Sequence, residues 1–139
     1  MKGDGRTYNM SDLATSVIVG MGGFIGANAR FIVGRWALHK FGVQFPVGTL
    51  LINVAGSFVL GLFATLAIHF AWDDRWRLLI AVGFIGAFTT FSTFEYETLE
   101  LAIQGSWLGA GLNILASVVC GFIAGFIGIA VARLLTRGH

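Results

Sequence analysis

Long apolar runs separated by short polar stretches form the main pattern of this chain. The runs cover residues 13 to 31 or beyond, 47–70, 78–104 and 108–135, and each holds few charged side chains. A helix crosses a bilayer with about 20 mainly apolar residues, because each residue advances it by about 1.5 Å. The pattern therefore predicts an all-α membrane protein with four spanning helices. They would form a single domain over residues 1–139, with a polar tail at about residues 1–11 and Ser11 or Asp12 as the first helix cap.

The third apolar run interrupts itself. Its first part, residues 78–88, is too short to cross a bilayer as a helix. Thr89, Thr90, Ser92 and Thr93 then follow at what would be the middle of the membrane. Non-helical backbone is tolerated there only where protein buries it or where it lines an aqueous cavity. Because the peptide groups freed by such a break bind ions, the sequence predicts a third helix broken at about residues 86–94 and an ion site at the break.

The composition also favours an integral membrane protein. Hydrophobic residues make up 56% of the chain and charged residues 12%, whereas a soluble domain carries about 25% charged residues. Twenty glycines and a single proline suit membrane helices that approach one another closely. The tryptophans fall at the ends of the predicted spans, where their rings favour the membrane interface: Trp36, Trp72, Trp76 and Trp107.

Several classes of function are disfavoured by the same residues. The net charge of +2 comes from few groups, and no basic patch interleaved with aromatic residues suggests nucleic acid as a partner. Cys120 is the only cysteine, so one chain cannot form a disulfide framework. The sequence contains no nucleophile–base pair, phosphate loop or metal cluster, so we expect no enzymatic activity.

Two sets of polar residues recur every four positions inside the spans, and each set therefore lies on one helix face. They are Thr49, Asn53 and Ser57 in the second span, and Asn113 and Ser117 in the fourth. Such residues commonly join membrane helices through hydrogen bonds. Beside a broken helix they also favour a polar path through the membrane, and the sequence leaves both interpretations open.

Three further residues suit contact with an anion. Arg30, predicted near the end of the first span, either faces a cavity as a fixed positive charge or extends to the lipid headgroups. Phe91 and Phe94 are three residues apart and share a face if the backbone is helical there. A phenyl edge carries partial positive charge, so edge-on rings can face an anion in a narrow, dry passage.

Three acidic residues follow the break and raise a competing interpretation. A proton-coupled transporter needs a carboxylate inside the membrane, and Glu95, Glu97 and Glu100 are candidates. All three approach the end of the span, so solvation at the interface or interaction with the start of the new helix is expected for at least two of them.

The string GFIGAFTTFSTF at residues 83–94 resembles the signature of the Fluc (CrcB-like) fluoride channels. The string PVGTLLINVAGS at residues 46–57 resembles the second helix of that family, and Gly22, Gly23, Gly26 and Arg30 resemble its first helix. The resemblance implies a passive fluoride channel in the cell membrane (inner or plasma membrane). It also implies an inverted, dual-topology homodimer with two pores, surrounded by lipid.

The resemblance assigns roles to individual residues. It implies fluoride contacts from the third-helix break, from the second and fourth helices and from a vestibule arginine: Phe91, Phe94, Thr90, Ser92, Thr93, Asn53, Asn113, Ser117 and Arg30. It further implies a structural sodium ion (Na+) at the dimer interface, held by the main-chain carbonyls of Gly86 and Thr89. Three positions depart from the family pattern: Glu95 and Gly121 stand where serine is common, and Ala87 where glycine is common.

Two alternatives remain at this point. A small proton-coupled exporter with four helices and dual topology would carry an acid within its first helix, and Asp12 at the edge is the only acid near that span. The second alternative is a membrane protein that transports nothing and whose polar residues only hold its helices together. Such a protein would show no ion flux.

Overall fold

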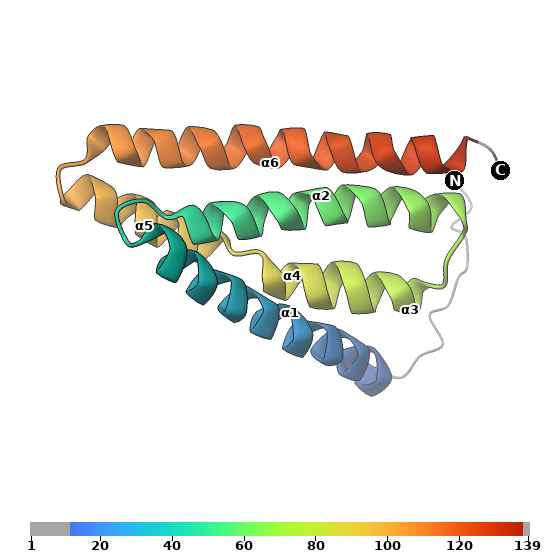
Figure 1. The fold of residues 1–139 in the computed structure, drawn as a ribbon. Helices are drawn as coiled ribbons and strands as arrows, with labels where there is room; N and C mark the ends of the chain where they lie inside the picture. Colours follow the sequence, from blue (N-terminus) through green and yellow to red (C-terminus); the bar gives the residue numbers. More distant parts are fainter. Residues whose placement is uncertain (1–11, 138–139) are drawn as a thin grey trace, which may run out of the picture.

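The computed structural model describes residues 12–137, and the long elements in that range are all helices (Figure 1). The chain order is α1 (Asp12–Phe41), α2 (Val47–His69), α3 (Asp74–Trp76), the π-helix η1 (Arg77–Ile85), α4 (Gly86–Phe88), α5 (Phe91–Ile103) and α6 (Trp107–Thr136). Elements α3 to α5 together make one interrupted span, so the four predicted spans and the all-α class are confirmed. The predicted tail at residues 1–11, with Ser11 as a cap, lies outside the described residues.

The structure corrects two boundaries. Helix α1 continues to Phe41, so Arg30 lies well inside it and not near its end, as the apolar run had suggested. The break in the third span is narrower than predicted, because only Thr89 and Thr90 leave the helix, and Phe91 already belongs to α5.

The helices form two closely packed pairs. Figure 1 shows α6 and α2 running side by side along their lengths, while α1 crosses the first half of the third span at an angle. Glycines make both contacts close. A Cβ atom at Gly26 would overlap the carbonyl oxygen of Phe84, and one at Gly128 would overlap that of Phe58. Apolar burial gives little drive for helix association within lipid, so backbone contacts of this kind provide much of the packing.

A single copy of the chain leaves much apolar surface open. Large side chains such as Phe24, Leu115 and Phe126 are mostly exposed, whereas the core consists mainly of small residues. Lipid or another membrane-embedded protein surface must cover these side chains, as expected of a protein within a bilayer.

Candidate ion site at the break in the third span

Two threonines form the break and cap the helices on both sides of it. Both residues have extended backbone, with φ and ψ of −77° and 155° at Thr89 and −150° and 116° at Thr90. The N–H and the hydroxyl of Thr89 both donate to the carbonyl of Ile85, at 3.0 and 2.9 Å. The hydroxyl of Thr90 accepts the N–H of Thr93 at 3.3 Å and donates to its hydroxyl at 2.9 Å. Thr90 is thus the N-cap of α5.

The side chain of Asn53 completes the break from α2. Its Oδ1 accepts the N–H of Thr90 at 2.9 Å, and its Nδ2 donates to the carbonyl of Thr90 at 3.1 Å. Both polar groups of a residue that has left the helix are therefore satisfied, which buried backbone requires. One hydrogen on Nδ2 remains after this pairing, because an amide nitrogen carries two.

These hydrogen bonds also free two carbonyls. In a regular helix the N–H groups of Thr90 and Thr93 would bond to the carbonyls of Gly86 and Thr89. Here they donate to the side chains of Asn53 and Thr90 instead. Gly86 is exposed and Thr89 is half-buried. The family resemblance assigns these two carbonyls to a cation. Both of them lose their regular helical donor at the break.

A cleft of about 270 Å³ lies between α2 and the break. Its walls combine amide, hydroxyl and aromatic groups with apolar ones: Asn53, Gly56, Ser57, Leu60, Ile85, Thr89, Thr90 and Phe91. Gly56 lets the break approach α2, because a Cβ atom there would overlap the Thr89 methyl group. The cleft has the hydrogen-bonding groups and the size to admit a small ion.

Phe91 and Phe94 lie together on the first turn of α5. Their ring centroids are 5.7 Å apart, and the ring planes are inclined by 51°. Phe91 is 74% exposed and Phe94 is half-buried, while Ser92 and Thr93 are exposed between them. The predicted shared face is present, and most of it is uncovered in a single copy of the chain. The role of these residues in a pore stays a prediction.

The two polar residues of α6 occupy different surroundings. Asn113 is buried, and its Nδ2 donates to the Thr98 hydroxyl at 2.8 Å. It therefore joins α6 to α5, which is the helix-joining interpretation left open for it. The Ser117 hydroxyl is buried and has no hydrogen-bond partner among the described residues. Its donor remains available, which suits a polar path better than helix joining.

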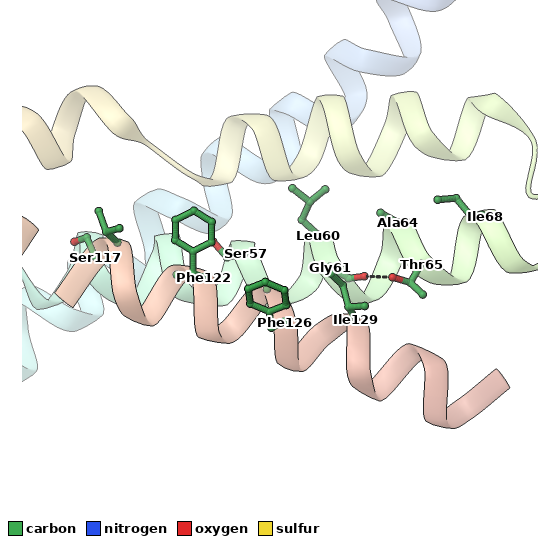
Figure 2. Close-up of a pocket in the computed structure, with 13 residues that line it drawn as sticks. Ser57, Leu60, Gly61, Ala64, Thr65, Ile68, Ser117, Phe122, Phe126 and Ile129 are labelled. Atoms are coloured by element: carbon green, nitrogen blue, oxygen red, sulfur yellow. Dashed lines mark hydrogen bonds between the residues drawn. The ribbon is translucent and has the colours of Figure 1, made fainter. Parts of the chain in front are cut away.

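Ser117 lies in a groove of about 730 Å³ between α2 and α6. Figure 2 shows Ser57 and Ser117 toward one end of this groove, and Thr65 and Ile68 toward the other. The Ser57 hydroxyl donates to the carbonyl of Asn53 at 2.8 Å. Ser57 and Leu60 line both the groove and the cleft at the break, so the two spaces adjoin.

Arg30 lies on α1 and is half-buried, with no carboxylate at ion-pair distance within the part of the chain that the structure describes. Its position inside α1 suits a fixed charge within the membrane region better than extension from a helix end.

Glu97, one of the three acids that the competing interpretation offers and not one of the residues predicted for the fluoride path, contacts α2 across the bundle. The Thr49 hydroxyl donates to its Oε1 at 2.9 Å, and its Oε2 is buried without a partner among the described residues. Both residues line a cavity of about 310 Å³. Glu95 and Glu100 are exposed, as expected for two of the three acids. Its spacing of three after Phe91 and Phe94 separates Glu97 from the other two acids in the sequence.

The chain is similar in sequence to a set of bacterial membrane proteins. The family model described as "CrcB-like protein, Camphor Resistance (CrcB)" matches residues 17–129. A protein of Roseiflexus sp. (strain RS-1) is 43% identical over 120 residues, covering 86% of this chain and 97% of that protein. One from Acidobacterium capsulatum is 47% identical over 116 residues, covering 83% and 93%. One from Koribacter versatilis is 50% identical over 105 residues, covering 73% and 82%. All three are named "Fluoride-specific ion channel FluC".

Proposed function

The chain belongs to the CrcB-like protein family, and from this premise we propose that it is a passive, fluoride-selective channel that exports fluoride across the cell membrane. The observation that carries the proposal is the break at Thr89 and Thr90, closed by the Asn53 amide beside a cleft inside the third span. Relatives that align with most of this chain are named as fluoride-specific channels.

The groups around the break suit a small, strongly hydrated anion. Such an ion loses its water only where hydrogen-bond donors replace it. The second N–H of Asn53 and the hydroxyl of Ser117 supply donors that nothing else in the described chain uses. The edges of Phe91 and Phe94 add partial positive charge without a mobile proton. Ser92, Thr93 and the Arg30 charge would serve the approaches to this path.

We further propose that two inverted copies assemble into the working channel. Phe91 is 74% exposed, and Ser92 and Thr93 beside it are exposed too. A path lined by these residues is open on one side in a single copy, so a second copy would be needed to enclose it. Inverted pairing of two such copies gives two equivalent pores.

A sodium ion would link the two copies at the break. The carbonyls of Gly86 and Thr89 have lost their regular helical donors, and neutral carbonyl oxygens are hard ligands that suit an alkali cation. Two carbonyls from each copy would supply four such ligands. The ion would have a structural role, since it neutralises the negative ends of two interrupted helices.

A flux assay tests the channel proposal. Purified protein reconstituted in liposomes is expected to release fluoride and retain chloride when a potential is applied. Equal release of both anions, or no release from folded protein, would contradict the proposal.

The proton-coupled exporter makes a different prediction in the same assay. Glu97 is the one acid in the third span that hydrogen-bonds across to α2, so it is the acid that coupling would use. Coupled transport would depend on a pH gradient and would stop in Glu97→Gln. A passive channel passes fluoride without a pH gradient.

A further inference from the structure

A separate cleft, which shares no lining residue with the cleft at the break, lies where the third span begins. It has a volume of about 400 Å³ and is lined by Ile18, Met21, Asp73, Arg75, Trp76 and Leu79, and we call it the Trp76 cleft. Asp74 is the first residue of the third span, so the mouth of the cleft lies at the membrane interface. The exposed Trp76 ring suits that depth.

The Trp76 cleft combines apolar walls with one pair of opposite charges. Ile18 and Met21 from α1 line the cleft together with Leu79 from η1, and these three side chains offer only apolar contacts. At the mouth, Arg75 Nε lies 4.0 Å from Asp73 Oδ1. Their side chains are 66% and 63% exposed, so most of their hydrogen-bonding capacity still faces solvent. An exposed pair of this kind adds little stability by itself.

We propose that the Trp76 cleft binds a phospholipid with a zwitterionic, primary-amine headgroup, of the phosphatidylethanolamine class. The phosphate would accept from the Arg75 guanidinium, which presents several donors in a planar fork. The ammonium would donate to the Asp73 carboxylate, and one acyl chain would lie along Met21 and Leu79.

The charge pair selects among lipid headgroups. Phosphatidylcholine has the same charges, but its quaternary nitrogen carries no hydrogen to donate to Asp73. Phosphatidylglycerol has no cation, so the Asp73 carboxylate would repel it. Only the primary amine satisfies both side chains with charge-assisted hydrogen bonds.

Lipid retention measured by native mass spectrometry tests this proposal without reference to ion transport. The purified full chain is mixed with phosphatidylethanolamine, phosphatidylcholine or phosphatidylglycerol of identical acyl chains. We expect about tenfold better retention of phosphatidylethanolamine, the ratio that about 1.4 kcal/mol would give. Equal retention of the three lipids, or preference for either of the others, overturns the proposal.

Matched double variants locate the binding. Asp73→Asn with Arg75→Gln removes both charges but keeps the cap on Arg75 N–H, since asparagine caps as well as aspartate. Asp74→Asn with Arg77→Gln makes the same change outside the cleft. The Asp73 and Arg75 variant should lose the preference for phosphatidylethanolamine, and the Asp74 and Arg77 variant should keep it. The opposite result, or an equal loss in both variants, overturns the proposal.

If the Asp73 and Arg75 variant does not fold, Met21→Trp provides a second test. This substitution fills the cleft from α1 and must abolish the preference for phosphatidylethanolamine. Retention of the preference in Met21→Trp likewise overturns it.

Discussion

The side-chain amide of Asn53 hydrogen-bonds to both the N–H and the carbonyl of Thr90, at 2.9 and 3.1 Å. One residue of α2 thereby replaces the helical partners that the third span lacks at its break. The same pairing keeps the N–H of Thr90 from the carbonyl of Gly86. Asn53 therefore both holds the break together and leaves a carbonyl free, so structure and ion binding depend on the same side chain.

Asn53→Ala should destabilise the protein and abolish fluoride flux. Thr90 is buried, so the substitution leaves two backbone groups without partners, at a cost of about 1 to 3 kcal/mol each. Thermal unfolding in detergent and fluoride efflux from liposomes measure the two effects. Asn28→Ala is the matched control, because among residues 12–137 the Asn28 amide bonds only to the Phe24 carbonyl of its own helix. Equal losses in both variants would refute the role given to Asn53.

Thr90→Val should weaken the start of α5. The substitution keeps the shape of the side chain but removes the hydroxyl that accepts the N–H of Thr93, and loss of such a cap costs about 1 kcal/mol. Thr90→Ser retains the hydroxyl and should retain most of the stability. Unfolding midpoints of the two variants provide the measurement. If Val and Ser lower the midpoint equally, the hydroxyl is not the stabilising group.

Phe91→Ile and Phe94→Ile should each reduce fluoride efflux at least tenfold while leaving the protein folded. Isoleucine fills similar space but lacks the positive ring edge that would face the anion. Phe24→Ile is the control, since Phe24 is 72% exposed on α1, close to the 74% of Phe91. Full efflux in both α5 variants would dismiss the aromatic contribution.

The spans could be predicted from sequence because hydrophobic length is a local property. The boundary of α1 could not, because the end of an apolar run marks where the membrane ends and not where the helix does. Helical hydrogen bonds continue through Arg35 and Lys40 to Phe41. Arg30 was therefore assigned to the wrong part of its helix.

The details of the site depend on pairs that are distant in sequence. Asn53 and Thr90 are 37 positions apart, and Thr49 and Glu97 are 48 apart. Spacing within one helix indicates which residues share a face, but it does not identify the residues of another helix that this face contacts. The break lies within the predicted residues 86–94 but is narrower, because the Thr90 cap starts a new helix at once and Phe91 is already helical.

Gly128→Ala should separate α2 from α6. A Cβ atom at this position would overlap the Phe58 carbonyl oxygen and would lie 2.8 Å from the Leu62 nitrogen. Overpacking against backbone costs about 1 to 3 kcal/mol. Gly111→Ala on the same helix meets nothing within 4 Å and should be neutral or stabilising by up to about 1 kcal/mol. Thermal unfolding of both variants measures the difference, and equal midpoints would show that close contact at Gly128 contributes nothing.

Removal of sodium should weaken the assembly without unfolding the helices. If the carbonyls of Gly86 and Thr89 from two copies share one cation, replacing sodium with a large organic cation leaves several carbonyl dipoles facing one another. These dipoles repel one another. A bound ion also stabilises the state that binds it by an amount that depends on the ion's concentration relative to its dissociation constant, so its removal lowers stability.

The fraction of dimer and the rate of fluoride efflux should both fall without sodium and should recover when sodium is restored. The circular dichroism spectrum should remain that of a helical protein throughout, because the hydrogen bonds of Asn53 and Thr90 do not involve the cation. A dimer fraction and efflux rate unaffected by thorough exchange would rule out the proposed sodium site, while loss of helix would indicate general unfolding instead.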